Sequence, residues 1–174
     1  VVDYAFTRID RLYIATGRAF PDALAAGAAA GLEGTAVLLV DGQASHVGES
    51  NLVLARHGVG ETIAVGGLAS IGHGVRNSLW SGPPTFTMAG ANRYATAAQL
   101  ADFVSWSRPD TVLVASGGGF ADALGASAAA SAFGAPLLLS LPTCMPTPTL
   151  DALDRLTLRS VALVGGRAAL SDAV

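Results

Sequence analysis

The sequence contains no lysine, a single cysteine and few charged residues of either sign. All ten basic residues are arginines, and with thirteen acidic residues they give a formal net charge of −3. Such a chain has no basic field to attract nucleic acid, so we expect no nucleic-acid partner. We interpret the exclusive use of arginine as codon bias in a GC-rich genome, although guanidinium groups also suit carboxylate or phosphate partners.

The lone Cys144 excludes an internal disulfide, and no histidine lies near it at metal-ligand spacing. The longest uncharged stretch near membrane-span length, residues 123–141, is interrupted by Gly134-Ala135-Pro136. We therefore expect no metal, no other cofactor and no membrane span. The chain starts at Val1 without a signal-peptide pattern, which suggests a mature or excised fragment.

An internal repeat organises the 174 residues, of which 51% are hydrophobic. Residues 15–31 match residues 115–131, and shorter matches further along keep nearly the same offset, so the chain holds two copies of one unit. We place the first repeat, which lacks its N-terminal part, at residues 1–83 and the second at residues 84–174. The uneven ends suggest a piece of a longer tandem array.

Each copy alternates short apolar runs with helical stretches. The second copy predicts strands and helices at 111–115, 122–133, 136–140, 149–156 and 160–164, with a last helical piece from Ala168. The strands are continuously apolar, which indicates burial on both faces and a parallel sheet. The predicted fold class is α/β, with tandem repeats that are each a small parallel sheet flanked by helices in a Rossmann-like three-layer arrangement.

The two Ala-rich helices are predicted to start alike. Asp22 and Asp122 are expected to cap the helices at 22–31 and 122–133, and Gly134 to end the second. Both helices are small and apolar almost all round, so we expect them to pack between the copies as well as within them.

The Gly-rich turn at Gly117-Gly118-Gly119 does not fit a dinucleotide site. The pattern G-x-G-x-x-G fails because Asp122 stands where the third glycine belongs. A carboxylate there also occupies the end of the helix that would bind a pyrophosphate.

Catalytic patterns are weak as well. Ser116 has no G-x-S-x-G context, and His46, His57 and His73 all lie in the first copy, so a function shared by both copies cannot depend on them. We interpret these histidines as surface residues, His57 being near a predicted helix C-terminus. Paired carboxylates could hydrolyse a glycoside. The first copy offers Asp22, Glu33, Asp41 and Glu49, but the second copy retains a counterpart only of Asp22. We assign no catalytic residue.

Several motifs together resemble the cell wall binding repeat 2 family of Gram-positive surface proteins. The second copy contributes Gly90-x-Asn92-Arg93-Tyr94-Ala95-Thr96-Ala97, Phe120-Ala121-Asp122-Ala123-Leu124, Ala135-Pro136-Leu137-Leu138-Leu139 and Val164-Gly165-Gly166. The first copy contributes Phe20-Pro21-Asp22-Ala23-Leu24, Val37-Leu38-Leu39 and Val65-Gly66-Gly67 in the same order. The resemblance covers nearly the whole chain.

This resemblance implies a tandem α/β unit, usually present in three copies around a pseudo-threefold axis. It implies an extracellular protein, held at the cell wall or cell surface by non-covalent binding to anionic secondary wall polymers or peptidoglycan, with any catalysis in a separate domain. A third copy would come from the parent chain or from another molecule. Asn92 stands where the family often has Asp, which puts an ion pair with Arg93 in doubt.

The ligand-contact residues implied by the resemblance are Arg93 and the Leu-Leu strand ends, namely Leu38, Leu39, Leu138 and Leu139. Arg18 and Arg167 join them because both follow strands in Gly-rich turns, where parallel sheets place their ligand sites. The leucines could equally form the sheet core, and Arg93 could brace a helix start. Two other functions stay open, a structural oligomerisation unit without a polymer ligand and an α/β hydrolase-like enzyme.

Overall fold

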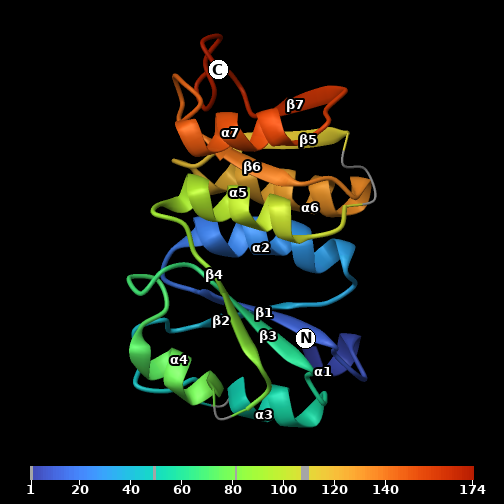
Figure 1. Cartoon of the computed structure of the whole chain (residues 1–174), viewed down its shortest axis with the longest axis vertical. Helices are drawn as coiled ribbons and strands as arrows, with labels where there is room; N and C mark the ends of the chain where they lie inside the picture. Colours follow the sequence, from blue (N-terminus) through green and yellow to red (C-terminus); the bar gives the residue numbers. More distant parts are fainter. Residues whose placement is uncertain (1, 49, 81, 107–109) are drawn as a thin grey trace.

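The computed structural model describes residues 2–48, 50–80, 82–106 and 110–174 and contains two parallel sheets, one from each repeat (Figure 1). The first sheet has the strand order β2-β1-β3-β4 and consists of β1 (Arg11–Thr16), β2 (Val37–Val40), β3 (Glu61–Val65) and β4 (Thr85–Met88). The second has the order β6-β5-β7 and consists of β5 (Thr111–Ser116), β6 (Leu137–Ser140) and β7 (Ser160–Val164). The predicted α/β class is confirmed.

The helices form layers on both sides of each sheet. They are α1 (Val2–Ala5), α2 (Phe20–Leu32), α3 (Ser50–Arg56), α4 (His73–Trp80), α5 (Arg93–Phe103), α6 (Phe120–Phe133) and α7 (Thr147–Arg155). Figure 1 shows α2, α5 and α6 stacked between the two sheets, with α3 and α4 beneath the first sheet. None of the helices in the described part of the chain is long and apolar enough to cross a membrane.

The inner strands are apolar along their whole length because helices cover both faces of each sheet. In β5, Leu113 and Ala115 join the core that contains the central helices, whereas Val112 and Val114 pack in the cluster that contains Ala152 of α7. Alternate side chains of one strand therefore reach different cores, and both must be apolar.

The first two strands of each repeat pair in the same register. Tyr13 pairs with Val37 across β1 and β2, and Leu113 pairs with Leu137 across β5 and β6. The strand at 85–88 pairs with β3 in parallel, so it completes the first sheet although it follows the last helix of that repeat.

The predicted helix caps at Asp22 and Asp122 are wrong. The helices begin two residues earlier, at Phe20 and Phe120, and neither flanking residue, Ala19 or Gly119, makes a side-chain cap hydrogen bond. Each aspartate lies instead in the first turn, where its charge favours the helix dipole.

The other end of α6 agrees with the sequence. Gly134 follows the last helical residue with φ of 67°, a left-handed conformation that glycine adopts without steric cost, as predicted. The expected helical piece from Ala168 is wrong, because the chain forms turns there.

Close packing of α2 on α6 joins the repeats. The Ser127 hydroxyl donates a hydrogen bond to the Leu24 carbonyl at 2.8 Å, and alanines of both helices are buried in one core cluster. The predicted packing between copies is confirmed.

Candidate functional site

The carboxyl ends of β1 and β5 are built alike. Gly17 donates its backbone N–H to the Val40 carbonyl, and Gly117 donates to that of Ser140, both at 2.8 Å. In each turn the hydroxyl of the last strand residue, Thr16 or Ser116, accepts a backbone N–H from two residues on. Ligand sites of open parallel sheets lie at this edge, so it is the candidate ligand site of both repeats.

Arg93 lies between the two turns. Asn92 caps α5 by accepting the backbone N–H groups of Tyr94 and Ala95 at 3.1 and 3.0 Å, which places Arg93 at the first helical position. Its guanidinium donates to the Gly117 carbonyl and lies 6.0 Å from the centre of the Phe20 ring. Arg93 therefore connects the two repeats, and it braces this region whether or not it also meets a ligand.

Arg18 and Arg167 are exposed, and each faces a nearby aspartate. The Nε atom of Arg18 lies 2.6 Å from Oδ1 of Asp41, and that of Arg167 lies 3.1 Å from Oδ1 of Asp172. Hydrogen bonding from Arg18 lowers the pKa of Asp41 below its usual value. Exposed ion pairs of this kind contribute little to stability, so their arginines can exchange partners readily.

The four leucines differ in exposure. Leu39 is 57% exposed and Leu38 is half-buried, but Leu138 and Leu139 are fully buried. The prediction that the second pair contacts a ligand is therefore wrong. The reason is α5, which packs on β6.

A groove of about 410 Å³ runs between the repeats beside Leu39. Its apolar lining includes Leu24, Phe120 and Leu124, and Arg18 stands at it. The rings of Phe20 and Phe120 meet there edge to face, with centres 6.3 Å apart. An apolar groove with a cation beside it can bind an amphiphilic ligand or another protein surface.

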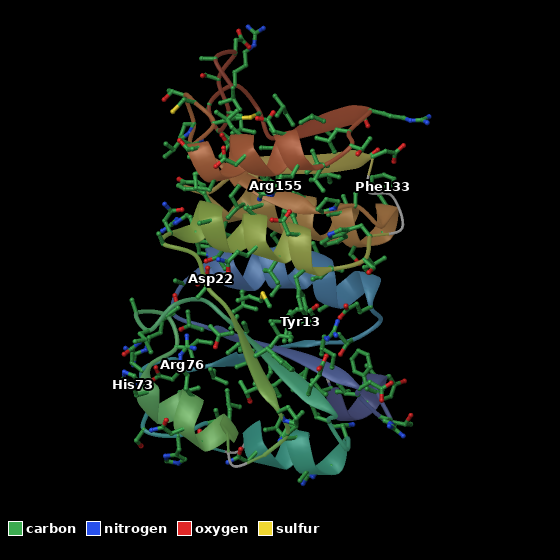
Figure 2. The ribbon with its side chains drawn as sticks, viewed as in Figure 1. Tyr13, Asp22, His73, Arg76, Phe133 and Arg155 are labelled. Atoms are coloured by element: carbon green, nitrogen blue, oxygen red, sulfur yellow. The ribbon has the colours of Figure 1, made fainter. Side chains whose placement is uncertain are left out.

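Asp22 is buried beside this edge of the first sheet (Figure 2). Burial raises the pKa of its carboxyl above the usual value, whereas the hydrogen bond from the Ser70 hydroxyl at 2.8 Å and the charge of Arg93 oppose that rise. Gly66, with φ of 111°, lies so close that a Cβ atom there would be 2.4 Å from Oδ2 of Asp22.

The residues considered for catalysis do not assemble. His46 and His73 are exposed as predicted, but His57 is buried, so its assignment to the surface is wrong. His57 directly follows α3, and its carbonyl accepts the backbone N–H of the buried Ile9, which holds it against the start of the first repeat. Glu49 lies outside the described residues. Within the described ranges no three His, Cys, Asp or Glu side chains gather as metal ligands.

The structure contains two polar clusters that the sequence does not predict. At the amino ends of the first sheet, Arg11 pairs with Glu33 at 2.6 Å and with Glu61, and the buried Tyr13 donates to Glu33 at 2.9 Å. Tyr13 and Arg76, the centres of the two clusters, are labelled in Figure 2. Only the pairing of β1 with β3, which puts Arg11 opposite Glu61, could have revealed the first cluster.

Arg76 forms the second cluster on α4. It is buried and donates to the carbonyls of Ile71 and Gly66 at 2.7 and 2.8 Å and to the Thr87 hydroxyl at 2.6 Å. Burial lowers its pKa. No sequence signal distinguishes this arginine from the exposed ones.

Comparison with known families decides the relationship. The family described as cell wall binding domain 2 (CWB2) matches residues 1–76 and 87–174, which is most of both repeats. The chain belongs to the CWB2 family. A search of curated protein sequences finds no match.

Solved structures show the same fold. This CWB2 chain is similar to Cwp6 from Clostridium difficile, with a TM-score of 0.83 and 21% identity over 96% of the chain and 27% of Cwp6. It is also similar to Cwp8 from Clostridium difficile, with a TM-score of 0.82 and 20% identity over 97% of the chain and 29% of Cwp8. The CWB2 chain thus spans less than a third of each of these proteins.

Proposed function

We propose that this chain is a non-catalytic module that anchors an exported protein to anionic secondary polymers of a Gram-positive cell wall. The CWB2 match over both repeats supports wall binding, and the exposed arginines at the carboxyl edge of the first sheet and beyond β7 support the anionic class of ligand. The setting is extracellular, at the cell wall or cell surface.

The observation that carries the polymer mechanism is the position of Arg18. It stands at the groove that contains Leu39, its side chain is 63% exposed, and its only counter-ion among the described residues is the exposed Asp41. A phosphate or carboxylate of the polymer can replace Asp41 at low cost, because exposed ion pairs are weak. Arg93 and Arg167 would add further contacts along the chain, and several weak contacts raise the overall affinity.

Co-sedimentation with walls tests this function. We expect the purified chain to sediment with intact Gram-positive walls, and to stay in solution with walls stripped of secondary polymers. Retention should fall as salt is raised, because the contacts are ionic. Equal retention on stripped walls would identify peptidoglycan as the ligand, and no retention on either would contradict the proposal.

A second function, self-association with further copies of the repeat, is favoured by the apolar groove. Leu39, Phe120 and Leu124 are 57%, 60% and 56% exposed within it. Contiguous exposed apolar side chains are typical of protein interfaces. We expect Leu124→Ser to lower the association state in sedimentation velocity, and Leu150→Ser, an exposed leucine on α7, to leave it unchanged. A monomer at all concentrations would contradict self-association.

A further inference from the structure

Arg18 and Asp41 form a bidentate ion pair at the carboxyl edge of the first sheet. The Nε atom of Arg18 lies 2.6 Å from Oδ1 of Asp41, and its Nη2 atom donates to Oδ2 at 2.7 Å. Both carboxylate oxygens thus meet one edge of the planar guanidinium, which is the geometry that an anionic ligand adopts on arginine. Asp41 therefore occupies the place of a ligand.

Asp41 begins a loop that is fixed to the neighbouring loop after β3. The Gly42 carbonyl accepts the backbone N–H of Gly72 at 2.7 Å. The two loops approach so closely that a Cβ atom at Gly42 would lie 1.8 Å from the Ser70 carbonyl oxygen. The backbone that carries the carboxylate is therefore held by a second loop of the same repeat.

Gln43 adds side-chain contacts to this loop. Its amide nitrogen donates to the carbonyls of Ala69 at 2.8 Å and Leu68 at 3.3 Å, and its backbone N–H donates to Oδ1 of Asp41 at 3.1 Å. Hydrogen bonds from Arg18 and from the Gln43 backbone lower the pKa of Asp41 below its usual value, so the carboxylate is ionised at neutral pH. Gln43 thus holds the carboxylate that Arg18 binds.

The second repeat has neither charge at the corresponding positions. Gly118 stands where the first repeat has Arg18, and Leu141 stands where it has Asp41. The loop itself recurs, since the Pro142 carbonyl accepts a backbone N–H from the segment after β7 at 2.8 Å. The carboxylate therefore accompanies the cation and is not needed to build the loop.

A small free anion gains little by replacing Asp41. The exchange substitutes one ion pair at Arg18 for another of the same kind, and the anion loses its translational and rotational freedom. An anionic group of a polymer that is already bound elsewhere on the chain loses little further freedom. Such a group can displace Asp41 where a free anion cannot.

We propose that Asp41 is a specificity-determining residue of the Arg18 site, a built-in competitor that keeps small free anions off Arg18 and admits anionic groups that belong to a polymer. Gln43 is the positioning residue that holds this carboxylate in place. The proposal rests on the polymer binding proposed above, and it adds which form of anion the site selects.

Titration with inorganic phosphate tests the competition directly. The readout is the NMR resonance of the Arg18 Nε–H group in the isotope-labelled chain, at neutral pH and constant ionic strength. We expect Asp41→Asn to bind phosphate at this site about two- to fivefold more tightly than wild type, the range expected when one exposed ion pair is removed. Asp10→Asn is the matched control, because Asp10 forms another exposed pair, with Arg8 at 3.0 Å, before β1. It should leave the phosphate affinity of Arg18 unchanged.

Gln43→Met tests the positioning role. Methionine has a similar shape but no amide donor, so the loop loses its side-chain hydrogen bonds to Ala69 and Leu68, and Asp41 is held less firmly. We expect a phosphate affinity between those of wild type and Asp41→Asn, and backbone spectra show whether each variant is folded. A wild-type affinity in Gln43→Met would overturn the positioning role, and a wild-type affinity in Asp41→Asn would overturn the competition.

Wall retention in the presence of phosphate tests the selection of a polymer. At constant ionic strength, added phosphate should reduce the retention of Asp41→Asn on walls that carry their secondary polymers by a larger factor than it reduces that of wild type. Equal factors would contradict the selection.

The two readouts separate this inference from wall binding itself. The expected order of phosphate affinities in a chain that does not sediment with walls would support the competition at Arg18 and contradict the proposed function. Wall retention, together with a phosphate affinity that Asp41→Asn leaves unchanged, would do the reverse.

Discussion

The hydroxyl of Ser127 on α6 donates a hydrogen bond to the carbonyl of Leu24 on α2, 103 residues earlier in the chain, at 2.8 Å. This close approach depends on the two glycines of α2, Gly27 and Gly31, which have no side chain. A Cβ atom at Gly27 would lie 2.6 Å from the Ser127 hydroxyl oxygen, and one at Gly31 would lie 2.0 Å from that of Ser131. The two repeats are therefore held together through small residues.

A pair of glycine substitutions tests this interface. We expect Gly31→Ala to lower the free energy of unfolding by roughly 1 kcal/mol, because overpacking against Ser131 exceeds the gain in helix propensity. The matched variant is Gly125→Ala on α6, where an added Cβ would meet nothing within 4 Å. It should raise that free energy by about 0.5–1 kcal/mol. Urea denaturation measures both, and equal signs for the two variants would contradict the account.

Ser70→Ala should destabilise the protein at neutral pH. The substitution removes the only hydroxyl that donates to the buried Asp22 carboxylate among the described residues. A buried group that loses its hydrogen bond costs about 1–3 kcal/mol. Urea denaturation at pH 7 measures the loss, and an unchanged midpoint would contradict it.

Asp22 itself predicts a pH dependence of stability. Burial raises the pKa of its carboxyl in the folded state, so the folded protein binds this proton more tightly than the unfolded chain. The contribution of Asp22 to stability is greatest below about pH 4 and falls as pH rises through its folded pKa. As pH rises from about 4 through this folded pKa, the free energy of unfolding of wild type should fall relative to that of Asp22→Asn. A wild-type value that stays constant or rises relative to the variant would contradict the assignment.

Arg76→Met should destabilise the first repeat by about 2 kcal/mol. The methionine fills much of the same space but leaves the buried carbonyls of Gly66 and Ile71 without their donors. Arg159→Met is the control, because Arg159 is highly exposed and its ion pair with Asp110 is long, at 3.7 Å. Thermal unfolding of both variants measures the difference, and similar melting temperatures would contradict a structural role for Arg76.

Much of the fold could be predicted from the sequence, because its signals are local and occur twice. The strand at 160–164 matches β7 residue for residue, and Gly134 ends α6 as expected. The helix starts could not be read correctly, because an aspartate in the first turn looks like an N-cap when the two residues before it also become helical. Phe120, the first residue of α6, packs its ring against that of Phe20, 100 positions earlier, a contact that no local pattern could indicate.

The candidate site could be predicted only in part. Leu39 and Leu139 occupy matching positions in the two repeats, yet one is 57% exposed and the other fully buried. The difference arises because α5 packs on β6, and in the described chain no equivalent helix packs on β2. Exposure of this kind depends on which elements meet in space, and the similar local sequences of the two strands do not reveal it.

The most direct test of the proposed polymer contact uses Arg18 and its counter-ion. Arg18→Ala removes the cation, whereas Asp41→Asn removes the competing carboxylate and leaves the cation in place. Retention on walls that carry their secondary polymers, measured at several salt concentrations, should fall for Arg18→Ala and rise for Asp41→Asn. Unchanged retention of both variants, each folded, would contradict an anionic ligand at Arg18.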